Sequence, residues 1–131
     1  MKKISFALIC VLSFSILSGC RKAMKVDNSL EELKGRGVFV LGLDDSFPPM
    51  GYRDDDGNII GYDIDLAKVV AERLGVTFKA QPIDWSAKEM ELSTGRIDCI
   101  WNGFTMTEER EKALSFTKPY MNNEQVLVVR K

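Results

Sequence analysis

Apolar residues gather in two kinds of segment that alternate along this chain. Nearly continuous apolar runs cover residues 38–43, 76–81 and 97–101, which is typical of strands buried on both faces of a sheet. Between them, residues 63–74 and 86–94 have the spacing or the start and stop residues of helices. This alternation predicts an α/β domain with a mainly parallel sheet flanked by helices.

Residues that favour helix starts precede the helical segments. Ser29 with Glu32, and Ser86 with Glu89, match the capping-box pattern, in which side chain and backbone satisfy each other's donors. Asp63 is expected to cap the helix that runs to residue 74. We therefore expect helices to begin at these three positions.

Residues 54–58, Asp-Asp-Asp-Gly-Asn, predict a hairpin turn between short arms at residue 52 and residues 59–60. A calcium loop is the alternative interpretation of this acidic run. It fails on register, because an EF-hand glycine at position six would place a tyrosine, Tyr52, where the motif needs an aspartate.

Three loops follow the three predicted strands: residues 44–49, 83–85 and 102–110. In an open parallel sheet, ligands bind in the crevice beyond the carboxyl ends of the strands. We therefore expect these loops to meet and to form a site.

The third loop has the composition of an anion site. Thr105 and Thr107 can each cap a following helix, and Arg110 falls within its first turn. Helix N–H groups and a guanidinium together favour a compact anion such as a carboxylate. The alternative is an ordinary helix start, with Thr105 and Glu108 forming a capping box and Arg110 solvated.

The ligand that matches all three loops is a zwitterion. Its carboxylate would pair with Arg110 and with the hydroxyl and N–H of Thr105, and its ammonium could reach the Gly103 carbonyl. Phe47 and Trp85 offer apolar walls, and Asp44 offers a carboxylate that could accept a hydrogen bond from an amine. The alternative interpretation is that Phe47 and Trp85 are core aromatics and Asp44 is a turn residue.

The first nineteen residues resemble a signal peptide. Lys2 and Lys3 precede an apolar run to Leu17, which is short for a membrane span. The ending Leu17-Ser18-Gly19-Cys20 resembles a bacterial lipobox, so Cys20 is expected to be the lipidated residue; a plain secretory signal is the alternative. Residues 20–28 are expected to be a tether between the membrane and a domain at 29–131.

Charge and residue types exclude several functions. Without residues 1–19 the chain keeps 16 basic against 19 acidic residues, a net charge of −3, which disfavours nucleic-acid binding. The chain has no histidine, which excludes Ser-His-Asp and Cys-His catalysis and the usual His-containing zinc sites. We expect Cys99 to be a buried small hydrophobe, and we expect no metal or cofactor.

Four motifs, residues 41–50, 61–67, 105–110 and 116–120, resemble in order and spacing the family 3 solute-binding proteins of bacterial polar amino-acid ABC importers. The resemblance implies the periplasmic-binding-protein-like (type II) venus-flytrap fold, in which an amino acid binds between two lobes. It also implies an extracytoplasmic location and delivery of the amino acid to ABC permease subunits, without catalysis.

Matched positions imply the roles of the site residues. Arg110 and Thr105 would hold the α-carboxylate and Gly103 the α-amino group, while the aromatic residues would flank the side chain. Many members have Ser or Ala at the position of Asn102, which leaves the choice of a polar or basic amino acid open. The implied ligand-binding residues are Asp44, Phe47, Trp85, Asn102, Gly103, Thr105 and Arg110.

The resemblance also bears on domain organisation. Residues 29–131 correspond to an incomplete first lobe, and residues 125–130 resemble the strand that leads into the hinge, so we expect the second lobe to be absent from this chain. We expect an exposed apolar strand edge, weak binding by this chain, and a monomer when full length. The rivals are an enzyme of the same fold, dehydratase-like or attached to a peptidoglycan-cleaving domain, and the sensor domain of a signalling receptor.

Overall fold

The computed structural model describes residues 27–131. The predicted leader, the lipidation site Cys20 and most of the tether lie outside the described residues. Within the described part of the chain, no helix is long and apolar enough to cross a membrane.

The fold is organised by a parallel sheet of three strands, in the order β5-β1-β6. These are β1 (Val38–Leu43), β5 (Thr77–Pro82) and β6 (Cys99–Ile100), and both pairings are parallel, as the sequence predicted. The third strand is shorter than expected. The reason is Asp98, whose side chain accepts the Val40 N–H at 2.8 Å and so replaces a backbone partner at the start of the strand.

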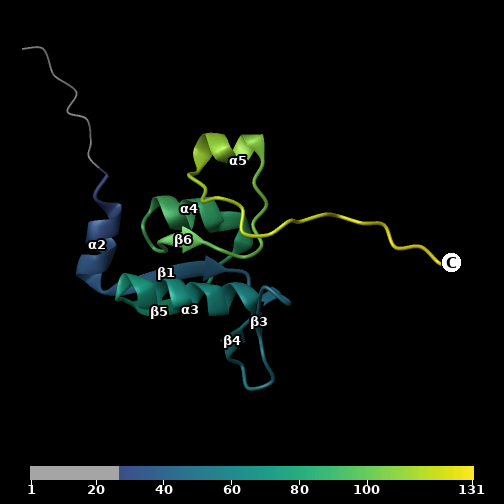
Figure 1. The fold of residues 1–131 in the computed structure, drawn as a ribbon, viewed down its shortest axis with the longest axis horizontal. Helices are drawn as coiled ribbons and strands as arrows, with labels where there is room; N and C mark the ends of the chain where they lie inside the picture. Colours follow the sequence, from purple (N-terminus) through teal and green to yellow (C-terminus); the bar gives the residue numbers. More distant parts are fainter. Residues whose placement is uncertain (1–26) are drawn as a thin grey trace, which may run out of the picture.

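Helices connect the strands of this sheet. The long helix α3 (Tyr62–Leu74) leads from β1 to β5, and a 3-10 turn η1 (Trp85–Ala87) with α4 (Lys88–Ser93) leads from β5 to β6. Because the two crossovers run in opposite directions along the sheet and such crossovers are right-handed, α3 and α4 lie on opposite faces. Figure 1 draws β1 between them.

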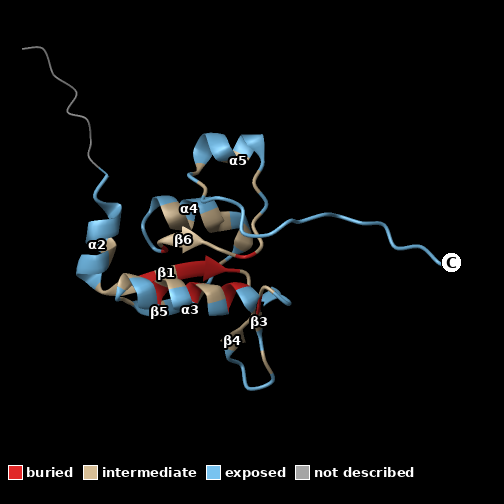
Figure 2. Ribbon diagram, in the orientation of Figure 1, coloured by how far each residue is buried: buried red, intermediate tan, exposed pale blue. Residues whose placement is uncertain are grey.

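The core lies between β1 and α3. Every second residue of the strand is buried against the helix, and Figure 2 shows this buried layer along β1 and the inner side of α3. The buried cluster comprises Phe39, Leu41, Leu43, Ile64, Ala67 and Ala71.

The other face of β1 depends on a glycine. A Cβ at Gly42 would lie 2.5 Å from Cδ1 of Ile97, which is buried. Only the absence of a side chain at Gly42 therefore lets Ile97 pack directly on the strand.

Two predicted helix caps are displaced. The first helix, α2 (Ser29–Arg36), has Asn28 as its N-cap residue, and the Ser29 N–H donates to Asp27 at 3.0 Å. The turn after β5 begins before Ser86, because Asp84 accepts the Ser86 N–H at 2.8 Å. In both cases the serine N–H donates to an aspartate two residues earlier, and these two predicted capping boxes are wrong.

Asp63 is not a cap either, because α3 begins at Tyr62 and Gly61 is the N-cap residue. The first N–H groups of α3 donate to backbone carbonyls: Tyr62 to Pro49 at 2.9 Å and Asp63 to Met50 at 3.0 Å. These donors need no capping side chain, so the Asp63 carboxylate is available for another role.

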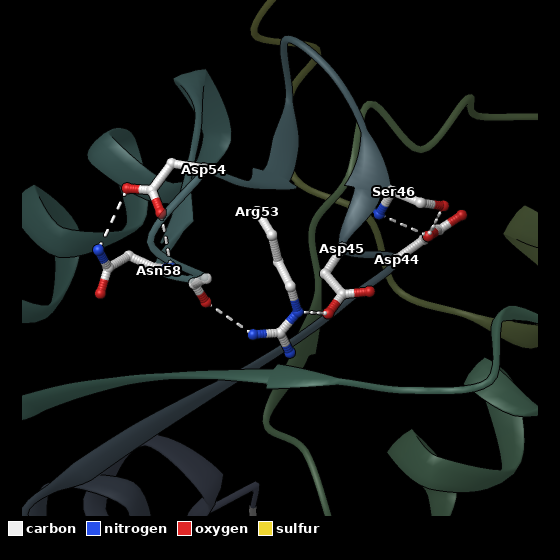
Figure 3. Close-up of polar contacts among 7 residues, drawn as sticks. Asp44, Asp45, Ser46, Arg53, Asp54 and Asn58 are labelled. Carbon is white, nitrogen blue, oxygen red and sulfur yellow. Dashed lines mark hydrogen bonds and ion pairs between the residues drawn. The ribbon is translucent and has the colours of Figure 1, made fainter.

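A second, antiparallel sheet follows β1 and consists of β2 (Ser46–Phe47), β3 (Gly51–Arg53) and β4 (Ile59–Ile60). The predicted hairpin at residues 54–58 is confirmed. Its turn is closed by Asp54, which accepts from the Asn58 N–H at 2.8 Å and from the Asn58 side chain (Figure 3).

The last helix, α5 (Glu108–Ala113), is followed by a segment without regular structure to residue 131. Residues 125–130, expected to be a strand, pair with no neighbouring strand among the described residues. Figure 1 shows this end of the chain extending away from the sheet.

Candidate functional site

The loop between β6 and α5 turns at Gly103. This residue has φ 57°, a left-handed conformation that glycine adopts without a steric penalty. A Cβ here would lie 3.4 Å from Cε1 of Phe47 and 3.4 Å from Cγ of Met50. Gly103 therefore allows both the turn and a close approach of the loop after β1.

The three loops predicted to meet do so around this turn. The Asp44 N–H donates to Oδ1 of Asn102 at 2.7 Å, which joins the first loop to the third. Trp85 packs edge-on against Phe104 with ring centroids 5.5 Å apart, which joins the second. The expected convergence beyond the carboxyl ends of the strands is confirmed.

Arg110 reaches back to the same loop. Its Nη1 donates to the Thr105 carbonyl at 2.7 Å, and its guanidinium carbon lies 4.3 Å from the centroid of the Phe104 ring. A cation over an aromatic face is attracted by the ring quadrupole, and the planar fork leaves further N–H donors for a ligand. The geometry fixes the position of one guanidinium beside Thr105.

The start of α5 shows which of the two threonines caps the helix. Thr107 is the N-cap residue and its Oγ1 accepts the Arg110 N–H at 3.3 Å, so the capping box from Thr105 to Glu108 is wrong. The hydroxyl of Thr105 instead accepts from Nδ2 of Asn123 at 2.8 Å. The Thr105 hydroxyl therefore takes no part in capping α5.

Next to this loop lies a cavity of about 690 Å³. The third loop, including Gly103 and Thr105, forms one of its walls and residues 114–123 form another; Phe47, Met50 and residues 98–101 also line it. Ligand cavities in proteins commonly measure about 300 to 1,000 Å³ and are mostly apolar with a few placed polar groups. This cavity therefore has room for a molecule of amino-acid size.

Four of the predicted site residues, Asp44, Trp85, Asn102 and Arg110, do not line this cavity; Arg110 reaches it only through its hydrogen bond to Thr105, which does. The carboxylate of Asp44 accepts the N–H of Ser46 at 2.9 Å and its hydroxyl at 2.6 Å, a turn role that Figure 3 shows. Asn102 is only 4% exposed and holds the loop after β1. Asp44 and Asn102 thus hold the loops, and Trp85 packs against Phe104, which lines the cavity.

Asp63 is a site residue that the sequence interpretation missed. Its side chain is fully buried; Oδ2 accepts the Gly103 N–H at 2.7 Å and Oδ1 accepts the Tyr120 hydroxyl at 2.8 Å. Burial raises the pKa of this carboxyl, opposed by the hydrogen bonds from Tyr120 and Gly103. A signal was present: Asp63 precedes Ala67 and Ala71 at four-residue spacing and so continues the buried stripe of α3.

Cys99 is half-buried and packs against the core. Burial, with a contribution from the neighbouring Asp98 charge, raises the pKa of its thiol to about 12. The thiol is protonated at neutral pH and is therefore a poor nucleophile, in agreement with a packing role.

The sheet order, the opposed helices and the loop cluster define one domain of a type II periplasmic binding protein. The chain belongs to the bacterial extracellular solute-binding proteins, family 3, whose family model matches residues 39–131.

Curated relatives agree with this assignment. The L-cystine-binding protein TcyJ of Escherichia coli is 31% identical over 115 residues, which cover 87% of this chain and 43% of that protein. The arginine-binding extracellular protein ArtP of Bacillus subtilis is 28% identical over 131 residues, which cover 100% of this chain and 49% of that protein. The chain spans about half the length of the relatives it matches.

Solved structures show the same fold. The arginine-bound form of domain 1 from TmArgBP is 45% identical with a TM-score of 0.66, over 68% of this chain and 71% of that one. A substrate-binding protein of an ABC uptake transporter from Streptococcus pneumoniae, with bound histidine, is 42% identical with a TM-score of 0.70, over 72% of this chain and 39% of that one.

Proposed function

We propose that this chain binds a polar or basic amino acid outside the cytoplasm and, as part of an ABC importer, delivers it to permease subunits without chemical change. The observation that carries the proposal is the Arg110 guanidinium hydrogen-bonded to Thr105, a residue that lines the cavity, in a member of a solute-binding family.

The ligand's α-carboxylate pairs with Arg110 and with the hydroxyl of Thr105. A fork of parallel donors suits a planar carboxylate and gives both affinity and orientation. In the unliganded chain the Thr105 hydroxyl is hydrogen-bonded to Asn123 at 2.8 Å, so the ligand exchanges this contact for its own. The Gly103 carbonyl accepts from the α-ammonium.

The ligand's side chain lies along Phe47, which is 49% exposed and lines the cavity. Asp44, Trp85 and Asn102 act through the loops that they hold. Trp85, for example, supports the Phe104 ring on which Arg110 lies. This division differs from the direct ligand contact that the family resemblance implied for these three residues.

Relatives indicate the range of ligands, because their names specify cystine, arginine and glutamine and one structure holds histidine. The arginine-bound domain 1 of TmArgBP supports binding by a single lobe. For the present chain we expect a dissociation constant in the micromolar range or weaker, because one wall of a two-lobed clamp supplies only part of the contacts.

Binding rather than catalysis is supported by the relatives, which are named as binding proteins. The absence of histidine from the chain removes the commonest acid–base catalyst. None of the observations on the described residues favours the enzyme or the sensor over the binding protein.

Calorimetric titration of the chain with arginine, histidine, glutamine and cystine tests the proposal. The matched control is agmatine, which is arginine without its carboxylate. We expect heat of binding with at least one amino acid, and for arginine a loss of at least about tenfold in affinity when the carboxylate is removed. Equal binding of arginine and agmatine, or no binding of any of the four amino acids, would overturn it.

We further propose that Cys20 carries a lipid that anchors the protein to the outer face of the cell membrane, on the strength of the lipobox-like residues 17–20. Membrane fractionation of the Cys20→Ala variant tests this. The variant should leave the membrane fraction, whereas continued membrane association would refute the anchor.

A further inference from the structure

Asp63 is an unusual feature of this core. It is fully buried, and among residues 27–131 no ion pair involves it. A buried carboxylate without a cation is costly unless hydrogen bonds satisfy it. Here the bonds come from the Gly103 N–H and the Tyr120 hydroxyl, residues that are 40 and 57 positions away in the sequence.

Both bonds end in the walls of the cavity. Gly103 belongs to the wall that contains Thr105, and Tyr120 belongs to the wall formed by residues 114–123. Tyr120 also packs against Trp101 with ring centroids 5.7 Å apart. One carboxylate on α3 therefore joins both walls to the buried core.

The backbone of the same residue reaches the third part of the cavity. The Asp63 N–H donates to the Met50 carbonyl at 3.0 Å, and the neighbouring Tyr62 N–H donates to the Pro49 carbonyl at 2.9 Å. Met50, like Phe47, lines the cavity. Asp63 thus forms hydrogen bonds to three of the segments that line the cavity: the loop after β1, the third loop and residues 114–123.

We propose that Asp63 is the positioning residue of the ligand site: by holding Gly103 and Tyr120 on one carboxylate it sets the separation of the two cavity walls and thereby the affinity for the amino acid. This inference rests on the proposed function. Asp63 does not touch the ligand; it acts through Gly103, whose N–H it occupies and whose carbonyl it leaves facing the α-ammonium.

The test measures loop order and affinity separately. Amide hydrogen exchange at Gly103 reports the Asp63 bond directly, and calorimetry with the tightest-binding amino acid of the panel reports the site. Asp63→Ala should raise the Gly103 exchange rate and the dissociation constant each by about tenfold or more, since hydrogen bonds to charged groups are among the strong ones. Asp63→Asn should rescue part of both effects, because an amide can accept from Gly103 and donate to Tyr120.

Two further variants complete the test, and they can be measured even if Asp63→Ala does not fold. Asp65→Asn is the matched control, since Asp65 lies on the same helix, is exposed and has a side chain that bonds only Lys68 among the described residues; it should change neither the exchange rate nor the affinity. Tyr120→Phe should leave Gly103 protected but raise exchange at residues 119–123 and weaken binding several-fold.

Unchanged Gly103 exchange in the folded Asp63 variants would show that Asp63 does not hold the third loop, and faster exchange with unchanged affinity would overturn the positioning role. If the unsubstituted chain binds none of the amino acids, the proposed function and the affinity part of this inference fall together. The exchange measurement would then still decide whether Asp63 holds the loop.

Discussion

At the scale of single residues, Arg110 is the group on which amino-acid recognition depends. Arg110→Ala removes the guanidinium beside Thr105, and the affinity for every bound amino acid should fall by about 10- to 100-fold, because a charge-assisted pair is lost. Calorimetry across the panel measures this. Lys112→Ala, which removes an exposed cation from the same helix, should have no effect; an equal loss in both variants would point to net charge rather than to a defined contact.

A second residue-scale prediction concerns pH. The native pKa of Asp63 is raised above the ordinary value of 3.8 by burial, so the native state binds this proton more tightly than the unfolded state does. The resulting stabilisation is complete below pH 3.8 and is lost as pH rises through the native pKa. The unfolding free energy of the wild type relative to Asp63→Asn should therefore decrease as pH rises from acid to neutral.

Urea unfolding of both proteins at several pH values measures this difference. Asp54 and Asp84, whose pKa values are lowered by hydrogen bonds from Asn58 and Ser86, titrate in both proteins and cancel. A difference that is independent of pH, or that grows as pH rises, would show that burial does not control the Asp63 carboxyl.

Residue by residue, sequence reasoning was most successful where the backbone decides. The run Asp-Asp-Asp-Gly-Asn at residues 54–58 predicts a hairpin turn, and the structure has one there, with Gly57 at φ 82°. It was least successful for Asp63. The hydrogen-bond partners of this carboxylate lie 40 and 57 positions away, and the local sequence does not indicate which distant segments pack against it.

At the scale of elements, β1 requires a glycine at its centre. Gly42→Ala would place a Cβ 2.5 Å from Cδ1 of Ile97, and the resulting overpacking should reduce the free energy of unfolding by about 1 to 3 kcal/mol. Adding Ile97→Val removes that methyl group and should recover part of the loss. Denaturant unfolding of the single and double variants measures the coupling.

Gly35→Ala is the matched control for this prediction. Nothing lies within 4 Å of the Cβ position in α2, and alanine favours helix, so stability should stay equal or rise slightly. Strict additivity of Gly42→Ala and Ile97→Val would contradict the proposed packing.

The elements themselves followed from the hydrophobic pattern, and their exact starts did not. The strand at residues 38–43 and the helix ending at residue 74 agree with the structure. The start of α3 was misjudged because backbone carbonyls of a distant loop satisfy its first donors. Such a contact depends on the tertiary fold and overrides the local capping pattern.

At the scale of the whole molecule, the C-terminal segment presents apolar side chains to solvent. Leu127 and Val128 are each 88% exposed, and their neighbours Val126 and Val129 are 77% and 73% exposed. An extended, apolar, β-branched segment is prone to pair with other chains. We expect this chain to self-associate as its concentration rises.

Sedimentation or light scattering over a range of concentrations tests this. Val128→Lys should suppress self-association, because a charge interrupts the apolar run. Val69→Lys, at a position on α3 that is 44% exposed, should leave it unchanged. Self-association that persists in Val128→Lys and disappears in Val69→Lys would place the contact on α3 instead.

At this scale the sequence indicated the fold class and the meeting of the loops, because strand order and crossover handedness leave few arrangements. It did not indicate the cavity between the third loop and residues 114–123. That cavity depends on Tyr120 reaching the buried Asp63, across 57 positions of the chain.

The residues that hold the cavity walls differ from those that would contact a ligand. Asp63 on α3 holds the walls, whereas the cavity-lining residues Phe47 and Thr105 belong to loops that contribute little to the hydrophobic core. Exchange of these loop side chains should therefore alter ligand preference at small cost in folding. Ligand specificity can therefore change through substitutions in the loops while the sheet and α3 stay unchanged. This separation offers a route for redesigning the selectivity of the protein.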